Sequence, residues 1–221
     1  MKTGLLPVLN LLLSIMSVAL CFIPYCLYRL RRLDPDKAYF IISLFWLING
    51  IVYIPDIFRW SWYSDIISNW ITISYNLVDA PLIILFFYFN FKRKFFLYLF
   101  SSFILFEMIM IAWKGAYFES NDIIIGVGTL ICLVLNIWSI SRYFLKIEHT
   151  EKEDVLVFAY AGYIFYYGLF SVVYIFNYLH FSKVTLPYVM FINYSAICIA
   201  TSLTIYGFWK NTETQYKEEK Y

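Results

Sequence analysis

One acidic residue, Asp79, lies in the middle of a long apolar run that extends from Ile66 to Asn90. The run has about 25 residues, which is enough for a helix to cross a bilayer. A carboxyl group at that depth is costly unless it faces a polar interior, so it indicates a functional site. Asp79 is therefore the first candidate for binding a ligand or a proton.

Further polar residues share one face of this run with Asp79. At about 100° per residue they fall within a wedge of roughly 100°. They are Asp65, Ser68, Thr72, Tyr75, Asn76 and Asp79. Beyond Asp79 the same face continues with Leu82, Ile83 and Phe86, which are apolar. The pattern predicts a polar cavity that opens at one membrane face and ends at Asp79.

Other apolar runs contribute polar side chains at compatible depths. Near residue 170, Tyr163, Tyr167 and Ser171 repeat at helical spacing and lie too deep for an interfacial aromatic belt. Buried tyrosine hydroxyls need hydrogen-bond partners, so this row is expected to face the other polar stripes. We expect the cavity to be completed by Asn49, Tyr53, Tyr167, Tyr174 and Asn193.

The sequence leaves open the roles of Asp79 and Glu107, the two carboxyl groups within apolar runs. Glu107 lies in an otherwise apolar run, with Lys114 seven residues later on the same face. It either reaches the outer membrane surface as a snorkelling side chain or serves as a proton-binding partner of Asp79. Asp79 itself either binds a ligand or proton, or joins the helices by hydrogen bonds to Tyr167 or Asn193.

The overall composition is that of a membrane protein. The chain of 221 residues is 62% hydrophobic and 14% charged, with a mean hydropathy of +0.69, which excludes an ordinary soluble domain. Apolar runs of about 19 to 25 residues, each long enough to span a bilayer, recur along the chain. They cover residues 5–28, 39–57, 66–90, 95–113, 123–145, 155–178 and 186–209. We predict an all-α, polytopic bundle of seven transmembrane helices over residues 1–209, followed by a cytoplasmic tail at 210–221.

The basic residues predict an orientation. Of the 17 Lys and Arg residues, 13 lie after the first, third, fifth and seventh runs, and 4 lie on the other side. Because basic loops stay in the cytoplasm, the N-terminus is expected outside and the C-terminus inside the plasma membrane. The net charge of +2 then reflects topology, and no basic surface for nucleic acid is expected.

Little in the sequence indicates catalysis. The two histidines lie away from the centres of the runs, and the four cysteines lie within predicted spans as small buried hydrophobic residues. Zinc hydrolases and Ser/His or Cys/His nucleophile pairs need a buried histidine. We therefore predict no catalytic residues, no metal site and no cofactor, although an intramembrane enzyme using Asp79 and Glu107 stays an alternative.

Two resemblances concern architecture. Seven helices with an external N-terminus resemble microbial rhodopsins, as do the strings Asp79–Ala80–Pro81–Leu82 and Asn193–Tyr194–Ser195–Ala196. Ile197 stands where that family has its retinal lysine, so the resemblance implies no Schiff base. The Tyr75–Asn76–Leu77–Val78–Asp79 string and the Ile, Phe, Tyr and Asn bias also resemble small, uncharacterised seven-helix membrane proteins of AT-rich bacteria. That resemblance implies a fold and no function.

The sequence is compatible with three functions. The pattern favours a receptor-like or sensory module with an outward-facing cavity. Binding of a small molecule in the cavity would shift the helices, and this movement would be transmitted to a cytoplasmic signalling partner. A proton-coupled small-solute transporter is the first alternative, because Pro81 breaks the helix beside a titratable group. An intramembrane enzyme is the second.

Overall fold

The computed structural model describes residues 5–30, 36–58, 65–115, 118–178 and 186–218, and these residues form seven α-helices without a strand. The helices are α1 (Leu5–Leu30), α2 (Lys37–Phe58), α3 (Asp65–Phe91), α4 (Lys94–Lys114), α5 (Phe118–Phe144), α6 (Glu151–Tyr178) and α7 (Leu186–Glu218). The predicted all-α class with seven membrane-length helices is confirmed. The last helix continues nine residues beyond Trp209, where the sequence predicted the span to end.

Each helix is long and apolar enough to cross a membrane. Helices satisfy their own backbone groups, which is why they can pass through hydrocarbon. Large apolar side chains such as Met108, Leu130 and Val134 are exposed in the middle of their helices. Contact between such side chains and water would be unfavourable. The chain is therefore a multi-pass integral membrane protein whose outer faces contact the lipid bilayer.

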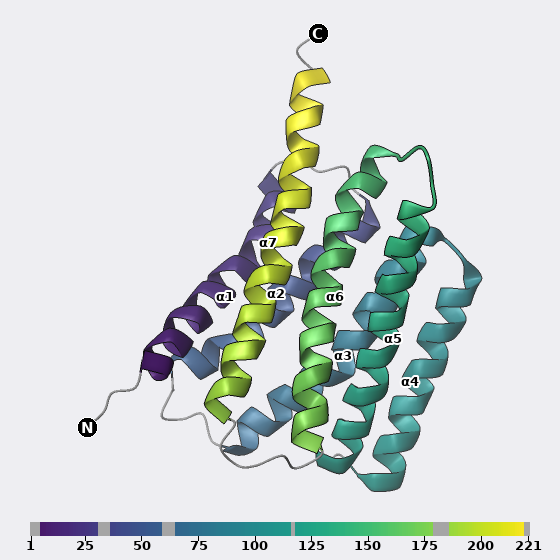
Figure 1. Cartoon of the computed structure of the whole chain (residues 1–221). Coiled ribbons are helices and arrows are strands. Elements are labelled where there is room, and N and C mark those ends of the chain that lie inside the picture. Colours follow the sequence, from purple (N-terminus) through teal and green to yellow (C-terminus); the bar gives the residue numbers. More distant parts are fainter. Residues whose placement is uncertain (1–4, 31–35, 59–64, 116–117, 179–185, 219–221) are drawn as a thin grey trace.

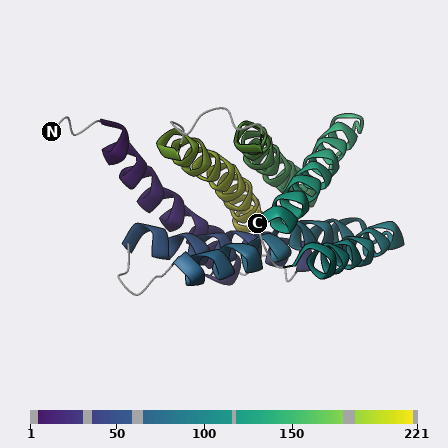
Figure 2. The ribbon, with the colours of Figure 1, turned by 90° about the horizontal axis from the view of Figure 1, so that it is seen from below.

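Six helices form a ring, in the order α1, α2, α3, α5, α6 and α7, and α7 packs back on α1. Helix α4 lies at the edge of the bundle against α3 and α5 (Figure 1). Viewed along the bundle, α2 and α3 form one side, and α1, α7, α6 and α5 form the other (Figure 2). The start of α1 and the end of α7 lie at opposite ends (Figure 1), as an odd number of crossings requires.

Aromatic side chains fill the centre of the ring. Trp46 on α2 stacks on Tyr163 of α6 with ring centroids 5.7 Å apart, and Phe45 meets Tyr163 edge-on. The Trp46 indole N–H donates to the Thr204 hydroxyl of α7 at 3.2 Å. A buried Trp needs such a partner for its N–H. The stacking and the hydrogen bond together hold α2 against both α6 and α7.

Helices α6 and α7 approach each other most closely at two glycines. A methyl group added to Gly162 would lie 2.7 Å from the Ala200 carbonyl oxygen, and one added to Gly207 would lie 2.7 Å from the Val155 carbonyl oxygen. Small residues permit such backbone contact between membrane helices, where dispersion forces drive packing. The same helix α6 carries Gly168, which has open space around it.

We expect Gly162→Ala to destabilise the protein by about 1–3 kcal/mol, because the added methyl group must push α6 away from α7. Gly168→Ala on the same helix should leave stability unchanged or raise it, since alanine is the better helix former. Thermal unfolding of both variants in detergent checks the difference. Equal stability of the two variants would contradict the close α6–α7 contact.

Candidate functional site

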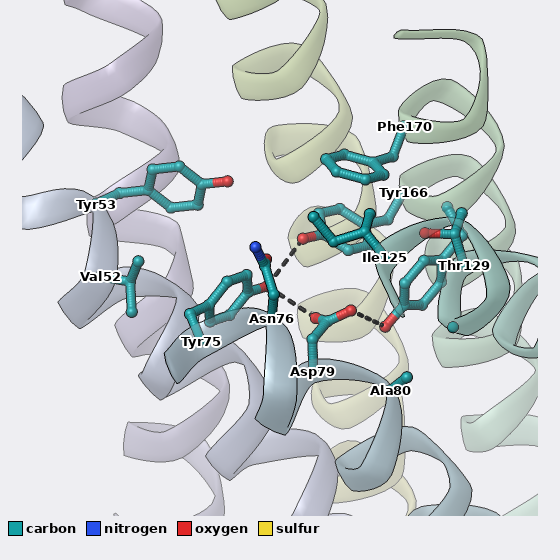
Figure 3. Close-up of a pocket in the computed structure, with 12 residues that line it drawn as sticks. Val52, Tyr53, Tyr75, Asn76, Asp79, Ala80, Ile125, Thr129, Tyr166 and Phe170 are labelled. Atoms are coloured by element: carbon teal, nitrogen blue, oxygen red, sulfur yellow. Dashed lines mark hydrogen bonds between the residues drawn. The ribbon is translucent and has the colours of Figure 1, made fainter. Parts of the chain in front are cut away.

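A cavity of about 170 Å³ lies between α2, α3, α5 and α6 (Figure 3). The helix segments that line it lie in the half of the bundle that contains the start of α1 (Figure 1). Its walls combine tyrosines, two other polar side chains, one carboxyl group and small or apolar residues. The lining residues are Val52, Tyr53, Tyr75, Asn76, Asp79, Ala80, Ile125, Gly128, Thr129, Tyr166, Tyr167 and Phe170. Aromatic walls with a few convergent polar groups are the usual form of a small-molecule site.

Asp79 is held at the floor of this cavity by two tyrosines. Its Oδ1 accepts a hydrogen bond from the Tyr75 hydroxyl at 2.8 Å, one helical turn away on α3. Its Oδ2 accepts from the Tyr167 hydroxyl of α6 at 2.9 Å. Figure 3 shows both contacts as dashed lines, with the carboxyl group between α3 and α6. Asp79 therefore joins two helices while it faces the cavity.

Tyr75 is the centre of the network. Its hydroxyl lies 2.7 Å from Asn49 Oδ1 on α2 and 2.9 Å from the Tyr166 hydroxyl on α6, in addition to Asp79. The Asn49 amide is oriented by its own Nδ2, which donates to the Phe45 carbonyl at 3.0 Å. This leaves Oδ1 as the atom that faces Tyr75, so α2, α3 and α6 meet at one phenolic oxygen.

Asn76 connects the cavity to α5. Its Nδ2 donates to Asn121 Oδ1 at 3.2 Å, and Asn121 is buried near the start of α5. Nearby, the spacing of α3 and α5 is set by Gly128, where an added methyl group would lie 2.9 Å from the Ala80 Cβ. A small residue at each of these positions brings α5 close enough to form one wall.

Below Asp79 the buried part of α3 is apolar and tightly packed. Ile83, Ile84, Phe86 and Phe87 on α3 are fully buried, and Phe86 packs on Tyr163 at a centroid distance of 6.2 Å. These side chains close the cavity on the side away from the start of α1. The site is therefore a pocket with a polar floor, and α3 provides no continuation through the bundle.

The structure brings together five of the ten residues that the sequence predicted for the site. Asp79, Asn76, Tyr75, Tyr53 and Tyr167 line the cavity.

A sixth predicted residue, Asn49, lies behind the wall of the cavity and acts through Tyr75. The side chain of a seventh, Thr72, lies outside the described part of the chain.

The other three predicted residues lie elsewhere. The Tyr174 hydroxyl donates to the Asp122 carbonyl at 2.9 Å, and Asn193 is half-buried on α7 away from the cavity wall. Glu107 is 4% exposed on α4. The interpretation of Glu107 as a side chain that snorkels to the membrane surface is therefore wrong. No hydrogen bond to Asp79 or any other described residue reaches its buried Oε1.

Sequence reasoning missed Tyr166, which lines the cavity and bonds to Tyr75. It lies about 100° from Tyr167 around the helix, so a single-face analysis of α6 omits it. Both tyrosines are buried because α6 is surrounded on several sides by other helices. The Tyr166–Tyr167 pair was the available signal, since two adjacent tyrosines in mid-span predict two polar faces.

Three buried polar atoms on α5 and α6 lack hydrogen-bond partners in the described part of the chain. They are the Tyr163 hydroxyl, Asn136 Oδ1 and Ser139 Oγ. Asn136 and Ser139 continue the α5 row that begins with Thr129 and Cys132, past the level of Asp79. Buried polar groups of this kind are normally satisfied by internal water, which needs two to four polar partners.

The charged residues near the helix ends pair with each other. The described ion pairs join Lys146 to Glu153 and Lys152 to Asp36. No lysine, arginine or histidine in the described ranges forms an ion pair with Asp79. In the same residues, no group of three or more His, Cys, Asp and Glu side chains is arranged to hold a metal ion.

No protein-family model matches the chain, and neither a curated protein nor a solved structure matches it. The function of the protein is therefore inferred from the chemistry of the cavity, and above all from Asp79 and Tyr75.

We expect Tyr75→Phe to lower the stability of the protein by about 1–3 kcal/mol, because it leaves Asp79 Oδ1 without a donor and leaves Asn49 Oδ1 with only the longer contact of 3.4 Å from the Tyr166 hydroxyl. Tyr98→Phe provides the matched control, since Tyr98 is exposed on the outer face of α4. Thermal or denaturant unfolding in detergent measures both. A loss in Tyr75→Phe no larger than that in Tyr98→Phe would contradict the central role of the Tyr75 hydroxyl.

Proposed function

We propose that this protein is a receptor-like or sensory membrane module that binds a small molecule in the Asp79 cavity. The observation that carries the proposal is the cavity itself, whose floor is a carboxyl group held by tyrosines from two helices. Walls from α2, α3, α5 and α6 mean that one ligand contacts four helices at once.

The hydrogen-bond network supports a response to binding. Tyr75, Asn49, Tyr166 and Asp79 connect α2, α3 and α6 through contacts of 2.7–2.9 Å. A ligand that takes the place of Tyr75 as donor to Asp79 changes the oxygen to which the Tyr75 hydroxyl donates, because each hydroxyl has a single hydrogen. Such a change alters the relative stability of two helix arrangements, which is what a receptor requires.

The same proposal includes the orientation and the location. Thirteen of the 17 Lys and Arg residues lie in the C-terminal parts of odd-numbered helices or in the segments that follow them, which favours an external N-terminus and a cytoplasmic C-terminus. The cavity then opens outward, toward ligands outside the plasma membrane of a bacterial cell. Basic loops on the inner side would contact a cytoplasmic signalling partner.

A proton-coupled solute transporter is the second candidate. It is favoured by the unpartnered Tyr163 hydroxyl, Asn136 Oδ1 and Ser139 Oγ, which extend polar groups past the apolar part of α3. Internal water at these atoms would supply a path for protons between the cavity and the other membrane face. The intramembrane enzyme has no comparable observation in its favour.

The binding proposal predicts that Val52→Trp abolishes ligand binding. Val52 lines the cavity, whereas its neighbour Ile51 is 52% exposed on the outside of α2. A collection of small polar molecules is screened for compounds that raise the melting temperature of the detergent-solubilised protein. Compounds that stabilise the wild type should fail with Val52→Trp and still act on Ile51→Trp.

Two results of this screen would argue against the proposal. One is a stabilising compound that acts equally on both tryptophan variants. The other is a complete absence of stabilising compounds while Ile51→Trp and the wild type are folded.

The transporter candidate predicts proton flux in proteoliposomes under an imposed pH gradient, and loss of that flux in Asp79→Asn. A pH-sensitive dye trapped inside the vesicles measures it. Flux in the wild type that disappears in a folded Asp79→Asn variant would establish the carrier and reject the receptor. A proton flux in wild-type proteoliposomes no larger than that in empty liposomes would reject the carrier.

A further inference from the structure

We infer that the ligand of this cavity is a small organic cation with an N–H group, that is, a protonated amine. The inference rests on the proposed binding function and specifies its ligand. Three features of the cavity carry it, namely its charge, its hydrogen-bond donors and its aromatic walls.

The first feature is the uncompensated acidic group. Among the described residues that line the cavity, Asp79 is the only one with an acidic or basic side chain. Within the described part of the chain no cationic side chain forms an ion pair with it. An ionised carboxylate away from water needs a positively charged partner. A ligand that carries a positive charge therefore binds there with a more favourable free energy than a neutral one.

The second feature is a shortage of hydrogen-bond donors. Four short oxygen–oxygen contacts join Tyr75 to Asn49, to Asp79 and to Tyr166, and Tyr167 to Asp79. With Asp79 ionised, only the three phenol groups carry hydrogens, because carboxylate and amide oxygens accept only. Four contacts therefore share three hydrogens.

A ligand N–H removes this shortage. Directed at Asp79 Oδ1, it takes the place of Tyr75 as donor to that oxygen. Tyr75 can then donate to Asn49 Oδ1 at 2.7 Å, while the Tyr166 hydroxyl donates to Tyr75 at 2.9 Å. Tyr167 continues to donate to Asp79 Oδ2 at 2.9 Å. Each of the three short contacts that remain then has its own hydrogen.

The third feature is the aromatic wall above the carboxyl group. Tyr53, Tyr166 and Phe170 surround the space beyond Asp79 (Figure 3). Tyr166 and Phe170 are stacked with centroids 6.4 Å apart, which places two rings side by side in one wall. Aromatic rings attract organic cations. The volume of about 170 Å³ limits the ligand to a few heavy atoms, since one liquid water takes up roughly 30 Å³.

Three probes of similar size separate the requirements. Propylamine carries the charge and an N–H, tetramethylammonium carries the charge alone, and propan-1-ol carries neither charge nor N–H. Titration calorimetry on the purified full-length protein in detergent, at a pH that keeps the amine protonated, measures each affinity. We expect propylamine to bind about 10- to 100-fold more tightly than propan-1-ol, as for hydrogen bonds to charged groups. Tetramethylammonium should lie between them.

Variants provide a second comparison. Asp79→Asn keeps the size of the side chain and removes its charge, so the preference for propylamine over propan-1-ol should disappear. Ile51→Trp, outside the cavity, should keep the wild-type preference. Because the three probes are compared on the wild type first, the test remains decisive even if Asp79→Asn does not fold.

Equal affinity of the wild type for propylamine and propan-1-ol would overturn the inference. If Val52→Trp abolishes this equal binding of the two probes, the proposed binding function stays intact and only the cationic ligand is rejected. If no probe and no screened compound binds, both the inference and the proposed function fail.

Discussion

A carboxyl group halfway along an apolar helix bundle has to be satisfied by the protein itself, and the surrounding structure follows from that requirement. Asp79 takes its two hydrogen bonds from Tyr75 and Tyr167 on different helices. Tyr75 in turn contacts Asn49 and Tyr166, so α2, α3 and α6 are held at one level of the bundle. In lipid, where apolar surfaces gain little from contacting each other, such polar contacts determine which helices are neighbours.

The packing around this network makes the cavity one-sided. Ile83, Ile84, Phe86 and Phe87 fill the space below Asp79, and the stacked pair of Trp46 and Tyr163 closes the centre of the ring. Close-packed interiors resist small continuous adjustments and respond by switching between arrangements. A ligand that changes the donors at Asp79 would act on α6, and α6 contacts α7 directly at Gly162 and Gly207.

The choice between the proposed receptor and the proposed carrier depends on the unpartnered polar atoms beyond Asp79. They belong to Tyr163 on α6 and to Asn136 and Ser139 on α5. If water occupies the region around these atoms, the floor of the cavity is connected to the other membrane face. If it stays dry, Asp79 ends a closed pocket. Both proposals use the same carboxyl group, and the hydration of these buried polar atoms distinguishes them.

The sequence alone determined the all-α class, the seven spans and the polar face of α3 that contains Tyr75, Asn76 and Asp79, because bilayer thickness and helical periodicity act locally along the chain. It also indicated that Tyr167 faces this stripe. Only the tertiary structure decided which helices meet there. It brought in Tyr166 and moved Asn193, Tyr174 and Glu107 away, because helix neighbours and rotations depend on packing between distant segments such as Gly128 against Ala80. Polar periodicity shows which face of a helix is buried, and only the assembled bundle shows what that face contacts.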